Sequence, residues 1–222
     1  MLLILLVLSI AAVDSLNPST LLPALLYAVG RHGVRDVAAF TAGIFTVSTA
    51  GGLILVFGPG RALLHFVSQP RPHLLHVLEA AAGVALLVAA AFLWRTRANV
   101  ARRLADQRPR KGGSALLVGA GIMATELPTA IPYFGALIAV SEGAHSALAD
   151  VALVLAYNLV FVAPLLALVA LLAVAGDRGT AVAQRLRVHL VRHAPIALPV
   201  LVALLGLALL AVGLAGLIRS WS

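Results

Sequence analysis

Six apolar segments dominate this sequence, and each is long enough to cross a lipid bilayer. A membrane-spanning helix needs about 20 mostly apolar residues, and 62% of the 222 residues are hydrophobic whereas only 11% are charged. The segments cover residues 2–29, 36–57, 73–94, 114–140, 147–175 and 196–218. This pattern predicts an all-α polytopic membrane protein with six transmembrane helices, and it leaves no room for a separate soluble catalytic or nucleotide-binding domain.

Basic residues are distributed unevenly among the connections between these segments, and this predicts the orientation of the chain. Most of the 16 Lys and Arg residues lie in the first, third and fifth connections, of which the third is 95–113 and the fifth is 176–195. Positively charged connections stay on the cytoplasmic side of a membrane. We therefore expect a multi-pass protein of the bacterial inner membrane, with 95–113 and 176–195 in the cytoplasm and both termini outside.

The fifth connection also has an amphipathic pattern. Within 182–192, apolar residues fall on one helical face and Arg and His residues fall on another. This pattern is typical of a cationic helix that lies on an anionic inner leaflet. An ordinary basic connection explains it equally well, so the sequence leaves both interpretations open.

Two of the apolar segments contain an acidic residue close to prolines. The first segment has Asp14, Asn17 and Pro18, and the fourth has Glu126 and Pro128. A carboxylate at bilayer depth costs about 2.5–3.5 kcal/mol even on lenient insertion scales, so Asp14 and Glu126 are candidate functional groups. Each proline removes a backbone donor and frees carbonyl groups, which must then face protein or a water-filled cavity. We therefore expect two interrupted helices that line a polar chamber.

The two interrupted segments share one pattern of hydroxyl residues and prolines. In order, the matching residues are Ser15, Pro18, Ser19 and Pro23 in the first segment, and Thr125, Pro128, Thr129 and Pro132 in the second. The copies lie in the first and the fourth span, so they cross the membrane in opposite directions. The sequence thus predicts a 3+3 inverted repeat, with residues 1–94 and 114–222 as its halves and 95–113 as a basic linker. Ordinary proline kinks are the alternative, and the match between the two segments argues against them.

The predicted chamber has candidate lining residues on both segments. The hydroxyl groups of Ser19, Thr20 and Thr129 would line it, and the amide of Asn17 would supply both a donor and an acceptor.

Small residues spaced four apart predict places where helices approach closely. Such pairs are Ala39 and Gly43, Ala120 and Ala124, and Ala211 and Ala215. They would permit close contact either inside one bundle or between the protomers of a homodimer, and the sequence leaves both open.

Three segments of the chain resemble a known family. They are DSLNPSTLLPALL at 14–26, ELPTAIPYFGALIAV at 126–140 and YNLVFVAPLL at 157–166. The chain is similar over essentially its whole length to the lysine-exporter superfamily, and within it to the glycopeptidolipid-addressing or sulfolipid-addressing proteins of actinobacteria. The resemblance implies export of lipid-linked, amphiphilic molecules. Related disulfide-relay proteins carry cysteines beside the prolines, and this chain has none.

The resemblance also implies a set of functional residues. The set comprises Asp14, Asn17, Pro18, Glu126, Pro128, Thr129, Pro132, Tyr133, Tyr157, Asn158 and Pro164. Asn158 and Pro164 stand out from the residues themselves as well, because both lie inside an apolar span. A structural hydrogen bond to a neighbouring helix is an equally good explanation of Asn158.

These observations together predict a secondary transporter or exporter rather than an enzyme. We expect one half of the bundle to rock against the other around the two breaks, with Asp14 and Glu126 as candidates for proton coupling. The expected partners are a lipid-like substrate and membrane lipids, without a cofactor, a metal ion or nucleic acid. The alternatives are a small-cation or metal exporter, an accessory subunit of a lipid-export machine, and an intramembrane enzyme that acts on lipids.

Overall fold

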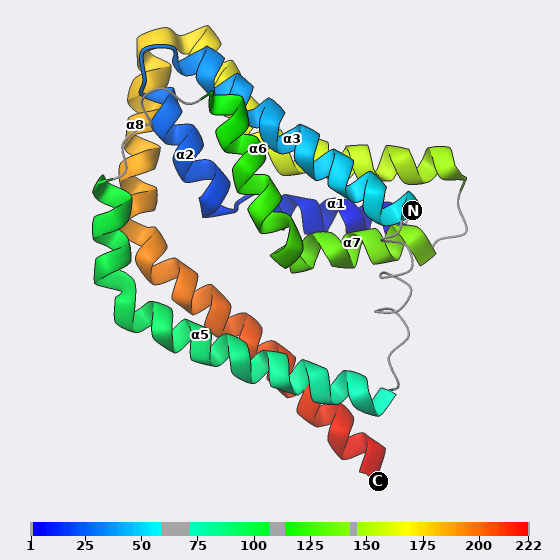
Figure 1. The fold of residues 1–222 in the computed structure, drawn as a ribbon. Coiled ribbons are helices and arrows are strands. Elements are labelled where there is room, and N and C mark those ends of the chain that lie inside the picture. Colours follow the sequence, from blue (N-terminus) through cyan, green and yellow to red (C-terminus); the bar gives the residue numbers. More distant parts are fainter. Residues whose placement is uncertain (1, 59–71, 107–113, 143–145, 222) are drawn as a thin grey trace. The chain divides into compact units, whose positions relative to one another are not determined.

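The computed structural model describes residues 2–58, 72–106, 114–142 and 146–221, and every regular element in these ranges is helical. The helices are α1 (Leu2–Asp14), α2 (Pro18–Ala28), α3 (Gly33–Phe57), α5 (Pro72–Asp106), α6 (Ala115–Glu126), the short 3₁₀ helix η1 (Leu127–Thr129), α7 (Ile131–Glu142) and α8 (Ala147–Trp221) (Figure 1). The predicted all-α class is therefore confirmed.

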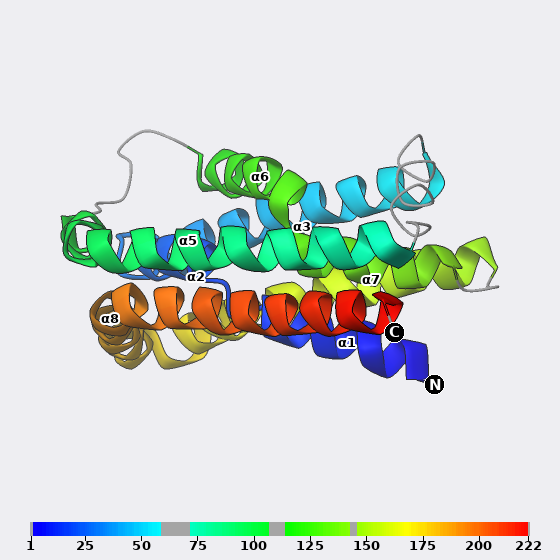
Figure 2. The ribbon, with the colours of Figure 1, turned by 90° about the horizontal axis from the view of Figure 1, so that it is seen from below.

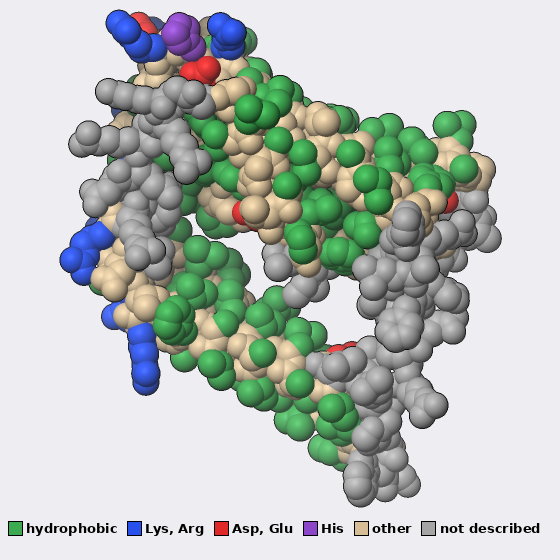
Figure 3. All heavy atoms as spheres, viewed as in Figure 1, with side chains coloured by type: hydrophobic (Ala, Val, Ile, Leu, Met, Phe, Trp, Pro, Cys, Tyr) green, Lys and Arg blue, Asp and Glu red, His purple; other side chains and the backbone are tan. Residues whose placement is uncertain are grey.

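Several of these helices are long and apolar enough to cross a membrane. Among the described residues, three helices qualify, in the stretches Gly33–Phe57, Glu79–Asn99 and Ala147–Arg219. The bent pair α1 and α2 makes a fourth if it forms one span. Many large hydrophobic side chains are exposed, and they are spread over the face of the molecule seen in Figure 3, as is expected of helices that contact lipid tails. These features are those of a helical membrane protein.

The chain divides into two compact units. Unit 1 comprises the described parts of Met1–Ser68 and Arg108–Arg187, and unit 2 comprises those of Gln69–Gln107 and Val188–Ser222. Unit 1 therefore holds α1, α2, α3, α6, η1, α7 and the first part of α8. Unit 2 holds α5 and the last part of α8. The predicted division into halves at 1–94 and 114–222 stays a prediction.

The first apolar segment is interrupted as predicted. Helix α1 ends at Asp14, α2 begins at Pro18, and the two helices are bent by 56°. Asn17 is the N-cap of α2, and its side chain accepts a hydrogen bond from the backbone N–H of Ser19. Proline suits the first turn of a helix because the N–H that it lacks has no partner inside the helix there. The motif Asn-Pro-Ser thus starts the second helix of the pair.

The fourth apolar segment is interrupted as well. Helix α6 ends at Glu126, the 3₁₀ turn η1 contains Pro128, and α7 begins at Ile131 after Ala130, which has a non-helical ψ of 69°. Each of α6 and α7 has 12 residues. A helix rises about 1.5 Å per residue, so neither piece alone could cross a bilayer core.

Helices α3 and α6 lie side by side in unit 1, and both ribbon views show this (Figures 1 and 2). A Cβ atom added to Gly43 would overlap the Leu116 carbonyl oxygen, and one added to Gly119 would overlap that of Phe40. The backbones approach this closely because neither glycine has a side chain. The small-residue row that contains Gly43 therefore serves a contact within the chain.

In unit 2, α5 packs along the C-terminal part of α8 by the same means. A Cβ atom at Gly83 would come within 2.6 Å of the Leu210 nitrogen, and one at Gly213 would come within 2.5 Å of the Ala80 nitrogen. Near the start of α5, His76 Nδ1 lies 3.1 Å from Glu79 Oε2. Small residues thus allow close helix contact in this unit too.

The structure differs from the sequence-based expectation in two connections. Helix α5 continues to Asp106, so the first part of 95–113 is helical, and the rest of this connection lies outside the described residues. Arg97 supports this extension, because its guanidinium lies 4.5 Å from the centre of the Trp94 ring and donates to the Trp94 carbonyl. Residues 177–195 are helical as well, within α8.

Helix α8 is interrupted at one residue. Gly176 has φ 49° and ψ −120°, a conformation that lies outside the helical region. Glycine reaches positive φ at little cost because it has no Cβ atom. After this interruption the chain is helical again. The segment 182–192 lies in this helical part, as its interpretation as a cationic helix requires.

Candidate functional site

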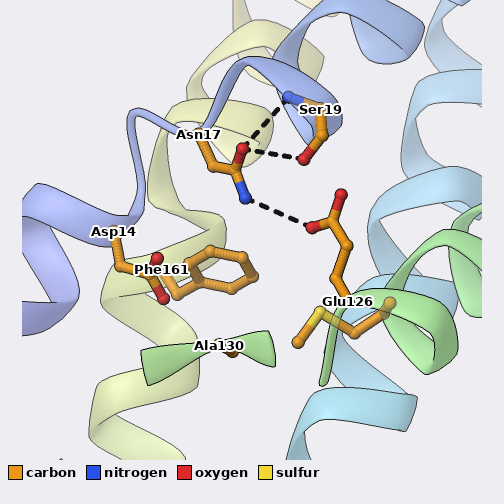
Figure 4. A pocket seen from close by; sticks show the side chains of 7 residues that line it. Asp14, Asn17, Ser19, Glu126, Ala130 and Phe161 are labelled. Carbon is orange, nitrogen blue, oxygen red and sulfur yellow. Dashed lines mark hydrogen bonds between the residues drawn. The ribbon is translucent and has the colours of Figure 1, made fainter. Parts of the chain in front are cut away.

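A cavity lies in unit 1 where the two interruptions meet. Its volume is about 400 Å³, and Figure 4 shows the side chains that line it. These residues are Asp14, Asn17, Ser19, Met123, Glu126, Ala130 and Phe161. They come from the α1–α2 break and the start of α2, from the end of α6, from the residue between η1 and α7, and from α8. Both acidic residues that the sequence singled out therefore line one cavity.

Asn17 joins the two interruptions through a single side chain. Its Oδ1 accepts hydrogen bonds from the Ser19 backbone N–H at 3.1 Å and from Ser19 Oγ at 2.7 Å. Its Nδ2 donates to Glu126 Oε2 at 3.2 Å. Figure 4 shows these bonds as one connected group. The amide thus caps α2 and contacts the carboxylate of the other break at the same time, using its acceptor and its donor separately.

Asp14 reaches the cavity from the last residue of α1. One of its oxygens, Oδ2, accepts a hydrogen bond of 2.9 Å from the Tyr157 hydroxyl on α8. Phe161, one turn after Tyr157 on α8, lines the same cavity (Figure 4). A phenol that donates to a carboxylate makes a charge-assisted bond whenever the acid is ionised.

Tyr157, the hydrogen-bond partner of Asp14, packs against a set of buried polar residues. The rings of Tyr157 and Tyr133 are 4.9 Å apart, and the Tyr133 hydroxyl donates to the Ser48 carbonyl of α3 at 2.7 Å. Asn158 Nδ2 donates both to the Tyr133 oxygen at 3.2 Å and to the Val154 carbonyl at 2.8 Å. Three helices, α3, α7 and α8, are linked in this way.

The predicted site residues fall into three groups in the structure. The first group lines the cavity and comprises Asp14, Asn17, Ser19 and Glu126. The second group is buried next to this lining and comprises Tyr157, which donates to Asp14, with Tyr133 and Asn158. The third group contains the remaining residues. Pro18 starts α2, and Thr20 donates to the Asn17 carbonyl at 3.0 Å. Pro128 is exposed in η1, and Pro164 is partly buried inside α8. The side chains of Thr129 and Pro132 lie outside the described part of the chain. The functional roles of all these residues stay predictions.

Sequence reasoning missed three lining residues, Met123, Ala130 and Phe161. Phe161 follows Tyr157 by four residues, and residues four apart share a helix face. That spacing could have identified Phe161. Met123 and Ala130 carry no comparable signal, because apolar residues occur throughout these helices.

The fold and the cavity define a class, which is a helical membrane protein with a polar cavity between two interrupted helices. The family described as Sap, sulfolipid-1-addressing protein, matches residues 7–215, so the chain belongs to this family. This confirms the family indicated by the three resembling segments. No curated protein matches the chain, and no solved structure matches it.

Proposed function

We propose that this protein transports a lipid-linked or amphiphilic molecule across the inner membrane by alternating access. The observation that carries the proposal is the cavity where the two interrupted helices meet, with the carboxylates of Asp14 and Glu126 in its lining. Interrupted helices at corresponding places in two halves of a chain are a common way to build a transporter's binding site. The family's description as sulfolipid-addressing supports a lipid-like substrate.

In this proposal the chain forms six spans in a 3+3 inverted repeat. The interrupted pair α1 and α2 is one span, α6 with η1 and α7 is another, and α8 supplies two spans on either side of Gly176. Helices α3 and α5 complete the six. Both termini lie outside, and the basic residues of 95–113 and 176–195 face the anionic inner leaflet.

The charges of the cavity support proton coupling. The lining has two carboxylates, and none of its described residues is Lys, Arg or His. An ionised acidic head group, such as a sulfate, would be repelled by ionised carboxylates in the same cavity. Protonated carboxyl groups would instead donate hydrogen bonds to it. Uptake of protons by Asp14 and Glu126 would therefore favour the binding of an anionic substrate.

The lining gives no support to the enzyme alternative. A serine nucleophile needs a base within hydrogen-bond reach. In the described lining Ser19 is the one hydroxyl residue, and its Oγ donates to the amide oxygen of Asn17, which is not a base. We therefore propose that the protein is a carrier rather than an enzyme.

Reconstitution of the purified chain in liposomes tests the proposal. The probe is a sulfated glycolipid with a fluorescent NBD tag, and dithionite quenching reports its passage between leaflets. We expect Asp14→Asn and Glu126→Gln to slow this passage and to flatten its dependence on pH. Asp177→Asn is the matched control, because Asp177 is exposed beside Gly176 and outside the cavity lining.

Two results would contradict parts of this proposal. A wild-type rate no faster than that of protein-free liposomes would reject transport by the chain alone, and would favour an accessory subunit of a larger export machine. An unchanged pH dependence in both Asp14→Asn and Glu126→Gln would reject the coupling role.

The two carboxylates also favour a second candidate, export of a small cation. A cavity lined by acidic groups, with no cationic side chain in its described lining, attracts positive charge. Liposomes that contain a fluorescent metal indicator separate the candidates. Flux of a metal ion without movement of the tagged lipid would replace the leading proposal with this one.

A further inference from the structure

Tyr157 touches a lining residue of the cavity without lining the cavity itself. Its side chain is only 2% exposed, and its hydroxyl donates to Asp14 Oδ2 at 2.9 Å. The lining residues that belong to α8 include Phe161 but not Tyr157. The direct contact between Tyr157 and this lining is its hydrogen bond to the Asp14 carboxylate.

The position of Tyr157 is itself determined by buried neighbours. Its ring lies 4.9 Å from that of Tyr133, with the planes tilted by 47°. Tyr133 is 1% exposed and is anchored by its hydroxyl to the Ser48 carbonyl, while Asn158, which is fully buried, donates to that hydroxyl. Hydrogen bonds to α3 and α8 thus hold the ring of Tyr133, against which Tyr157 packs.

Gly52 leaves the space that this arrangement needs. It follows Ser48 by one turn of α3, and a Cβ atom added there would overlap the Tyr133 hydroxyl. The same Cβ atom would come within 3.0 Å of Val154 on α8. The absence of a side chain at Gly52 is therefore a condition for the bond between Tyr133 and Ser48.

We propose that Tyr157 is a positioning residue, which holds the Asp14 carboxylate in the orientation that a substrate or a proton meets in the cavity. The buried group of Tyr133, Asn158 and the Ser48 carbonyl holds Tyr157 in place. Asp14 is the last residue of α1, at a break in the chain, and its side chain can rotate about two bonds. The hydrogen bond from the Tyr157 hydroxyl on α8 restricts this rotation. This inference rests on the proposed transport function and assigns to Tyr157 a role different from that of the lining residues.

The test compares the removal of single hydroxyl groups from buried tyrosines. Tyr157→Phe removes the donor to Asp14 and keeps the ring against Tyr133. Tyr27→Phe is the matched control, because Tyr27 is also buried and packs on Phe40, with ring centres 5.7 Å apart, outside the cavity lining. Loss of a hydrogen bond to a charged group corresponds to about a tenfold change or more. We therefore expect Tyr157→Phe to slow passage of the NBD-tagged sulfated glycolipid by about tenfold, and Tyr27→Phe to leave it near the wild-type rate.

A second measurement does not depend on transport. The infrared carboxyl band of Asp14 is identified by its loss in Asp14→Asn, and it should shift in Tyr157→Phe but not in Tyr27→Phe. If the wild-type protein moves no lipid, the proposed function fails, while the band still decides whether Tyr157 orients Asp14. An unshifted band would overturn the inference. So would a shifted band with a wild-type transport rate, since the bond would then exist without a role.

Discussion

Replacement of Asn17 tests the central geometry of the cavity most directly, because one side chain both caps α2 and contacts the other break. Asn17→Ala removes the acceptor for the Ser19 N–H and the donor to Glu126 Oε2. Loss of a helix N-cap costs about 0.5–2 kcal/mol. An interhelical hydrogen bond in a membrane protein contributes about 0.6 kcal/mol on average and at most about 1.7.

The expected magnitude follows from these two contributions. Asn17→Ala should lower the free energy of unfolding by about 1–4 kcal/mol. Asn17→Ser keeps a short side-chain oxygen that can cap α2 but cannot reach Glu126, so it should lower that free energy by about 0.6–1.7 kcal/mol only. The difference between the two variants isolates the cap.

Reversible unfolding in mixed detergent micelles, followed by far-UV circular dichroism, measures these differences. A double-mutant cycle of Asn17→Ser with Glu126→Ala isolates the contact between the breaks. Equal losses in Asn17→Ala and Asn17→Ser would refute the capping role. A coupling free energy near zero in the cycle would refute the bond between Asn17 and Glu126, and with it the junction of the two breaks at the cavity.

Two further predictions concern glycines, and the same unfolding measurement checks both. Gly43→Ala should destabilise the protein by about 1–3 kcal/mol, because its Cβ atom would overlap the backbone of α6, whereas Gly121→Ala is the control, since nothing lies within 4 Å of a Cβ atom there. A Gly43→Ala protein as stable as the control would disprove the close contact of α3 and α6. Gly176→Ala should cost about 1–3 kcal/mol, because φ at Gly176 is 49°. An increase in stability would show that α8 is not interrupted at this residue.

Sequence reasoning located both breaks and the polar residues at them. It did so because a proline lacks the backbone N–H that a regular helix uses, and because a carboxylate inside an apolar run is costly. The pairing of Asn17 with Glu126 could not be derived in the same way, since these residues are 109 positions apart. The identity of the acceptor depends on how α1, α2 and α6 pack.

The helix ends were predicted less well than the breaks. The expected connection at 95–113 begins inside α5, because Arg and Ala favour a helix even where the sequence is no longer apolar. Residues 177–195 belong to α8 for the same reason. Hydropathy identifies the part of a helix that lies in the bilayer, and the helix itself can extend beyond the bilayer.

The sequence alone determined the all-α membrane class, the two interruptions and the family, because each depends on local composition, on single prolines and acids, or on short motifs. Only the tertiary structure decided which side chains meet. It placed Tyr157 against Asp14, anchored Tyr133 to the backbone of Ser48 and brought Phe161 into the cavity lining. The physical reason is that these contacts join residues far apart in the chain, and close packing at glycines such as Gly52 sets their distances.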